Sequence, residues 1–299
     1  MGSKSSKLPL QPSKKEFDKE WRKTNWSKGK RDAMVDALRN FNLNDPEVGH
    51  LRCLLLGPVG AGKSSFINSV NTIFQGRVAH SALTTDCSST SFTKTYKTYY
   101  ITVGTNRLPF AFNDAMGLED DIRIDIGKDT PRGILHNDII NALKGHLPEN
   151  YVFNPYSALS DKSEQYKRSP KLSDKVHCLV YVIPANKLSI MSKDVIKKMK
   201  EVREIASEMG IPQVVVMTMA DMACDLVEKD LQKVYFSTAL VKSIERCSIE
   251  LGVPLNCILP VKNYHMEIDL DNDMDILILT AMTQIMNFAN DYIGLLKQK

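Results

Sequence analysis

Several features are missing from this sequence, and each absence narrows its function. No apolar run approaches the roughly 18–20 residues that a membrane-spanning helix needs, and the N-terminus lacks the apolar core of a secretory signal. The six cysteines are scattered, with no C-x-x-C pair, which is typical of reduced thiols and not of a metal site. We therefore expect a cytoplasmic protein without structural zinc.

Most of the chain also lacks an excess of positive charge. Residues 1–32 carry ten Lys and Arg against four acids, a net charge of +6, whereas the whole chain has +4. The remaining residues therefore sum to −2, which argues against a nucleic-acid-binding body. The basic N-terminal segment suits one of two partners, an anionic membrane surface or an acidic protein.

Strand and helix signals alternate along the chain, which predicts an α/β fold with a mostly parallel sheet and helices on both faces. We assign residues 1–48 to a basic, partly disordered segment with a short helix, and 49–299 to the main domain, with a long surface loop at about 145–175. The predicted strands are 51–56, 91–103, 108–112, 176–183, 212–218 and 256–261. The predicted helices are 32–41, 63–74, 192–209, 231–251 and 273–296.

A glycine-rich loop follows the first predicted strand and precedes a predicted helix. Its eight residues fit the pattern G-x-x-x-x-G-K-[ST], in which backbone N–H groups surround phosphates, the lysine neutralises them and the hydroxyl ligates Mg²⁺. The candidate phosphate-binding residues are Gly57, Pro58, Val59, Gly60, Ala61, Gly62, Lys63, Ser64 and Ser65.

Two further segments supply candidates for the metal and the terminal phosphate. Asp114 ends a predicted strand, where its carboxylate can hold the Mg²⁺ shell, and Gly117 allows a backbone N–H to reach the phosphate. Between these elements and the phosphate loop, Thr84 or Thr85 is the candidate switch hydroxyl. The predicted Mg²⁺ ligands are therefore Ser64, Asp114 and one threonine of this pair.

The remaining candidates concern a nucleotide base. Thr218 and Asp221 end the predicted strand 212–218, and a carboxylate there can accept hydrogen bonds from guanine N1–H and its exocyclic amine. Val261 and Lys262 follow the last predicted strand, where a backbone N–H can contact the base. The predicted ligands are GTP or GDP with Mg²⁺.

The order of these motifs resembles that of Ras-like GTPases, and several stretches resemble the interferon-induced protein 44 family more closely. They are Trp21-Arg22 with Trp26, LLLGPVGAGKSSFINSV at 54–70, DAMGL at 114–118 and PVKNY at 260–264. The resemblance covers about residues 17–297. It implies a three-layer P-loop GTPase-like G domain in a cytosolic GTP-binding protein of innate immune and antiviral responses.

Two positions depart from the usual GTPase pattern. Met219 occupies the place of the lysine whose aliphatic chain lies along the base, so guanine selectivity should be weaker. Leu118 follows Gly117, where small GTPases often carry the glutamine that orients water, so hydrolysis should be slow unless a partner or a second copy completes the site.

The N-terminus fits the myristoylation pattern M-G-x-x-x-[ST], which makes Gly2 a candidate lipidation site beside the basic cluster. The alternative is a polar, disordered start. A second acidic pattern, Asp269, Asp271, Asp273 and Asp275, lacks the glycine and glutamate of a Ca²⁺ loop and indicates the start of a helix.

Three functions fit the sequence. The first is a GTP-binding switch or slow GTPase in the cytoplasm, membrane-associated if Gly2 is lipidated. The second is an interaction scaffold with a degenerate nucleotide site, which binds a second copy or a signalling protein. The third is an ATP-using P-loop protein, which Asp221 disfavours.

Overall fold

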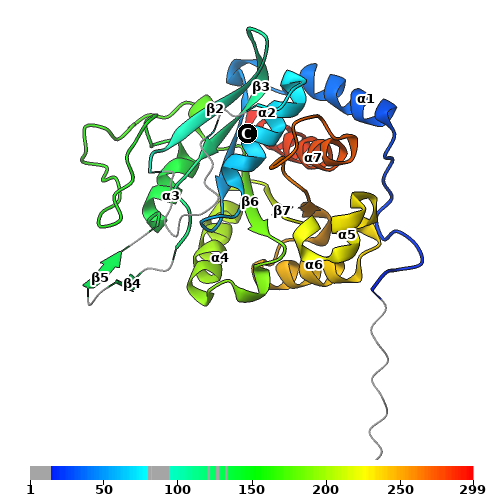
Figure 1. Ribbon diagram of the computed structural model, residues 1–299. Helices are drawn as coiled ribbons and strands as arrows, with labels where there is room; N and C mark the ends of the chain where they lie inside the picture. The colour runs from blue at the N-terminus through cyan, green and yellow to red at the C-terminus, as the bar shows by residue number, and fades with distance from the viewer. Residues whose placement is uncertain are drawn as a thin grey trace, which may run out of the picture.

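The computed structural model describes residues 15–79, 82, 94–119, 122–125, 128–131 and 133–298. Six strands form one sheet in the order β2-β3-β1-β6-β7-β8 (Figure 1). β2 runs antiparallel to β3, and the other neighbouring pairs are parallel, as the sequence predicts. The bounds are β1 Leu51–Leu56, β2 Lys97–Val103, β3 Asn106–Asp114, β6 Cys178–Pro184, β7 Gln213–Thr218 and β8 Ile258–Pro260. A separate antiparallel ribbon is formed by β4 Ile122–Asp125 and β5 Lys128–Pro131.

Helices cover both faces of the sheet, which makes three layers (Figure 1). α7 contacts both α1 and α2 on one side, and α4 contacts both α3 and α6 on the other. The bounds are α1 Lys28–Arg39, α2 Lys63–Gln75, α3 His136–Lys144, α4 Lys193–Glu208, α5 Asp225–Lys229, α6 Thr238–Leu251 and α7 Asn272–Lys297. Among the described residues, no helix has both the length and the apolar character needed to cross a bilayer.

The predicted helix 231–251 is wrong as a single element. A short 3₁₀ helix, η5 (Leu231–Tyr235), comes first, and α6 begins only at Thr238. Ser237 separates them because its hydroxyl accepts a hydrogen bond from the N–H of Leu240 at 3.2 Å, which caps α6. By contrast, α7 begins where the acidic run predicts, with the Asp271 side chain accepting from two backbone N–H groups.

The N-terminal segment with Trp21 and Trp26 packs on the main domain. The ring of Trp21 meets that of Tyr235 edge-on, with 5.2 Å between centroids. The Arg22 guanidinium donates to the carbonyls of Leu255 and Ile258 at 3.1 and 3.2 Å. Residues 1–14, which include Gly2, lie outside the described residues.

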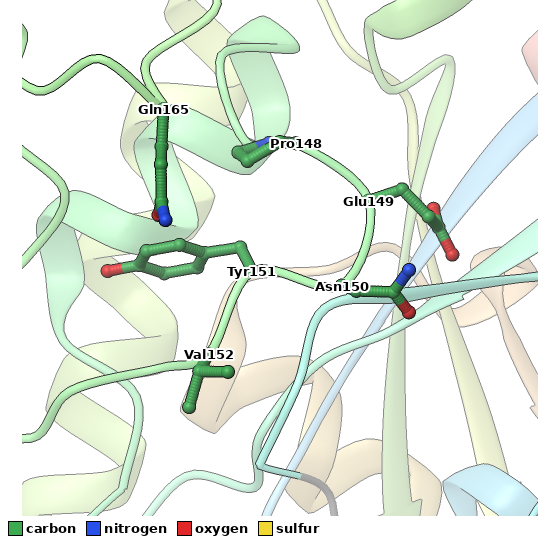
Figure 2. Close-up of a pocket in the computed structure, with 6 residues that line it drawn as sticks. All are labelled: Pro148, Glu149, Asn150, Tyr151, Val152 and Gln165. Carbon is green, nitrogen blue, oxygen red and sulfur yellow. The ribbon is translucent and has the colours of Figure 1, made fainter.

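The segment 145–175 is irregular apart from the short 3₁₀ helix η2 (Leu172–Asp174), and it is anchored to the domain. Asp138 in α3 is buried and accepts a hydrogen bond from the N–H of Leu159 at 2.8 Å. A pocket of about 490 Å³ opens within the segment, between Gln165 and the turn at residues 148–152 (Figure 2). Its one acidic side chain, Glu149, already accepts two hydrogen bonds from Thr98, so this pocket offers no spare charged group.

Candidate functional site

The phosphate loop connects β1 to α2, and two of its glycines are required by the backbone. A Cβ at Gly57 would collide with the carbonyl oxygen of Val182 on the neighbouring strand β6. Gly62, which caps α2, has a φ of +90°, a conformation that L side chains rarely adopt. The apolar strand β1 thus delivers a tight turn at the N-terminus of α2, where backbone N–H groups favour anions.

Lys63 lies folded over its own loop. Its Nζ donates to the carbonyl oxygens of Gly57 and Pro58 at 3.1 and 3.2 Å, and the residue is only 7% exposed. Burial lowers the pKa of Lys63, while the charges of Asp114 and Glu119 oppose that shift. A polyphosphate placed in the loop would supply the negative charge that this buried ammonium needs.

Ser64 and Asp114 bring two oxygen ligands together. Parallel pairing of β1 and β3 places Leu55 beside Asp114, and the Ser64 hydroxyl donates to Asp114 Oδ2 at 3.0 Å. A hydroxyl and a carboxylate are the hard oxygen donors that Mg²⁺ takes when phosphates and water complete its shell. The donor set therefore fits the predicted metal, and Thr84 and Thr85 lie outside the described residues.

The segment after Asp114 is paired with the phosphate loop. The N–H of Leu118 donates to the carbonyl of Gly57 at 3.0 Å, and the N–H of Val59 donates to the carbonyl of Leu118 at 3.3 Å. A Cβ at Gly117 would stand 2.6 Å from a methyl carbon of Val59, so this position needs glycine. Leu118 itself is 1% exposed and belongs to the core.

Two side chains connect the base side of the site to the phosphate loop. The Thr218 hydroxyl, at the end of β7, donates to the carbonyl of Ala61 at 2.6 Å. The Asn263 amide, beyond β8, donates to the carbonyl of Gly62 at 3.2 Å. These links come from two different strands, and together they fix the loops after β7 and β8 relative to the phosphate loop.

A pocket of about 530 Å³ lies between these three loops. Gly60 and Ser65 line it on the phosphate side, and Asp221 and Lys262 line it on the base side. Met219 also lines the pocket, with a φ of +55° that is unusual for a residue with a side chain. Six of the predicted phosphate and base residues therefore line one common space, namely Val59, Gly60, Gly62, Ser65, Asp221 and Lys262.

Lys262 forms an ion pair across the rim of this pocket. Its Nζ lies 2.8 Å from Glu267 Oε1. Burial opposes ionisation of Glu267, but hydrogen bonds from Lys262 and from backbone N–H groups outweigh it and lower the pKa of Glu267 to about 2. The pair holds the loop after β8 closed on itself.

Most predicted site residues meet at this sheet edge, but Val261 has another role. Its N–H donates to the carbonyl of Met217 at 2.8 Å and its side chain is buried, so it joins β7 to β8 and does not line the pocket. Sequence reasoning missed Asn263 and Glu267 as pocket residues. The PVKNY stretch contains the first, whereas nothing local distinguishes Glu267.

The strand order, the phosphate loop and the Ser64–Asp114 contact define an α/β fold of the P-loop GTPase type. The chain is 34% identical over 266 residues to human interferon-induced protein 44, covering 88% of this chain and 57% of that protein. The mouse protein of the same name is 31% identical over 262 residues, covering 87% and 60%. Human interferon-induced protein 44-like is 32% identical over 265 residues, covering 88% and 57%. The chain belongs to the interferon-induced protein 44 family.

The chain spans about three fifths of the length of these curated relatives. No protein-family model matches it. Among solved structures, Toc33 from Arabidopsis thaliana in complex with GDP and Mg²⁺ superposes with a TM-score of 0.43 at 13% identity, covering 88% of this chain and 91% of that chain. The fold assignment rests on the strand order and phosphate loop of this chain itself.

Proposed function

We propose that this chain binds guanine nucleotides and acts as a GTP/GDP switch or a slow GTPase. The observation that carries the proposal is the common pocket of Asp221 and the phosphate loop, held in register by the Thr218–Ala61 hydrogen bond. Asp221 offers acceptors to guanine N1–H and its exocyclic amine, donors that adenine does not present in that arrangement.

Each residue of the predicted site has a separate role. Lys63, which now donates to loop carbonyls, would bind phosphate oxygens, and Ser64 and Asp114 would hold Mg²⁺. When bound, Mg²⁺ supplies charge neutralisation at the phosphates. No side chain at position 118 can orient a water molecule, because Leu118 is apolar and buried, so hydrolysis by the isolated chain is slow.

The names of the relatives suggest the setting. Human interferon-induced protein 44 is named for its induction by interferon. On this basis we place the chain in the interferon response, in the cytoplasm, with the basic N-terminal segment and an acylated Gly2 as a membrane contact. A second copy of the chain or a signalling partner would complete the site for hydrolysis.

Calorimetric titration with GTP, GDP and ATP in the presence of Mg²⁺ tests the nucleotide assignment. We expect GTP and GDP to bind, ATP to bind more weakly, and Lys63→Ala to abolish binding while the protein stays folded by circular dichroism. A folded Lys63→Ala variant with wild-type affinity would show that the site is wrong. Equal displacement by ATP and GTP would remove the guanine assignment.

The buried, backbone-paired Leu118 favours a second candidate, an interaction scaffold whose nucleotide site has lost hydrolysis. Leu118 is bonded through both its N–H and its carbonyl to the phosphate loop. Such a protein would bind nucleotide without turnover, and its partner binding would not depend on whether GTP or GDP is present. Partner capture in the two nucleotide states separates the two candidates.

A further inference from the structure

A hydrogen-bonded chain of side chains runs from the N-terminal helix to the loop after β8. Arg31 of α1 donates from Nε to Asp275 Oδ2 at 2.9 Å, and a second guanidinium nitrogen lies 2.8 Å from the same oxygen. The other carboxylate oxygen, Asp275 Oδ1, accepts a 2.7 Å hydrogen bond from the Tyr264 hydroxyl. The N–H of Asp271 donates to that hydroxyl at 2.8 Å.

The chain continues to the phosphate side. The N–H of Tyr264 donates to the Ser69 hydroxyl at 2.9 Å, and that hydroxyl donates to the carbonyl of Ser65 at 2.7 Å. Ser65 follows the predicted Mg²⁺ ligand and lines the pocket, as Tyr264 does. A single tyrosine thus connects α7, α2 and the loop 261–267.

The hydrogen-bonded series of side chains is buried and charged, so the position of each member depends on the others. Asp275 is 1% exposed and the Arg31 side chain 18%. A buried carboxylate costs free energy unless it is paired and hydrogen-bonded, so losing either partner shifts the arrangement of the other. The pair spans 244 positions in sequence, from α1 to the first turn of α7.

We propose that Tyr264 and Asp275 are positioning residues for the base side of the pocket, and that Arg31 makes their position depend on the docking of α1. The inference rests on the proposed function, in which a guanine nucleotide occupies the pocket that residues 262–267 line together with Asp221. Its consequence is regulatory. A partner or membrane that displaces the N-terminal segment would loosen the base loop and weaken nucleotide binding without touching the phosphate loop.

The first test separates base from phosphate binding. Tyr264→Phe removes the hydroxyl and keeps the ring. We expect roughly a five- to tenfold loss of affinity for GTP and GDP, and unchanged affinity for tripolyphosphate, which lacks a base. Arg31→Gln should act in the same direction and Arg31→Lys should recover part of the loss. Tyr292→Phe is the matched control. Tyr292 lies in the C-terminal part of α7, and its hydroxyl makes only a long hydrogen bond, 3.4 Å, to the carbonyl of Met209.

An equal loss of tripolyphosphate and nucleotide affinity would overturn the positioning role, as would no loss of either. Hydrogen exchange of the free protein tests the same claim without a ligand, so it stays decisive even if the wild type binds no guanine nucleotide. Amides of residues 261–267 should exchange several-fold faster in Tyr264→Phe and Arg31→Gln, and amides of α6 should not change. Unchanged exchange in the loop would refute the inference and leave the proposed function intact.

Discussion

The Thr218 hydroxyl bonds the Ala61 carbonyl at 2.6 Å across 157 positions of sequence, and both residues are fully buried. Thr218 ends β7, and Ala61 lies in the middle of the phosphate loop. The bond therefore sets the distance between the end of the strand that precedes Asp221 and the loop that would hold phosphates. A nucleotide has a fixed length, so this spacing decides whether base and phosphates can both be bound.

Replacing this hydroxyl should affect stability and binding together. Thr218→Val keeps the shape but leaves the Ala61 carbonyl buried without its donor, which costs about 1–3 kcal/mol. We expect urea unfolding to show that loss and the affinity for GDP to fall, whereas Thr218→Ser should stay close to wild type in both. Wild-type stability of Thr218→Val would show that the bond contributes nothing.

Base choice should depend on Asp221. Asparagine at this position replaces one acceptor oxygen by an N–H donor, which suits xanthine, because xanthine carries a carbonyl where guanine has its exocyclic amine. Asp221→Asn should therefore lose roughly tenfold or more in GDP affinity, about 1.4 kcal/mol, and gain affinity for xanthosine diphosphate. Competition with a fluorescent nucleotide measures both changes, and unchanged preference would remove Asp221 from the base site.

Met219 should limit guanine selectivity rather than create it. Met219→Lys supplies the aliphatic chain and charge of the usual GTPase lysine in the same pocket as Asp221. We expect a wider gap between GTP and ATP affinity in Met219→Lys than in wild type. Met219→Leu is the control for side-chain size, and a gap of the same width in both variants would contradict the assignment.

Hydrolysis should be slow, and a glutamine at position 118 should not make it faster. The isolated chain should turn over GTP at about 10⁻⁴–10⁻³ s⁻¹, the unassisted range of small GTPases. Leu118→Gln should not raise this rate, because position 118 is buried and its backbone is bonded to the phosphate loop. It should instead lower the free energy of unfolding by about 1–3 kcal/mol, since it buries an amide. Fast hydrolysis independent of protein concentration would reveal a catalytic group elsewhere.

The parts of the site that the sequence predicts are those encoded in short segments. The phosphate loop, Asp114 and Thr218 each follow an apolar strand, so their places at one sheet edge follow from the parallel sheet. Contacts across distant segments carry no such local pattern. Nothing near Arg31 indicates that it meets Asp275, and Val261 looks like a pocket residue until the link between β7 and β8 is seen.

The errors in the fold have equally local causes. α3 is missed because it has nine residues and its N-cap, Leu135, makes no side-chain capping bond, so the usual start signal is absent. The predicted helix 231–251 joins two elements because apolar residues lie on both sides of Ser237 and hide the break there. The capping bond that Ser237 accepts forms only in the folded chain. Periodicity alone cannot distinguish a capping serine from an ordinary helical one.

Nucleotide affinity should depend on pH through Lys63. Burial lowers the pKa of Lys63 in the free protein, and phosphates bound beside it must raise that pKa again. A group whose pKa is higher in the complex takes up a proton on binding, so affinity falls as the pH rises through the lowered pKa of the free protein. Lys63→Arg stays charged throughout and is the matched control, in which any titration of the ligand itself still appears. Calorimetry in buffers of different ionisation enthalpy should show more proton uptake on nucleotide binding for wild type than for Lys63→Arg. Equal uptake in the two proteins would mean that Lys63 is already fully protonated before the nucleotide binds.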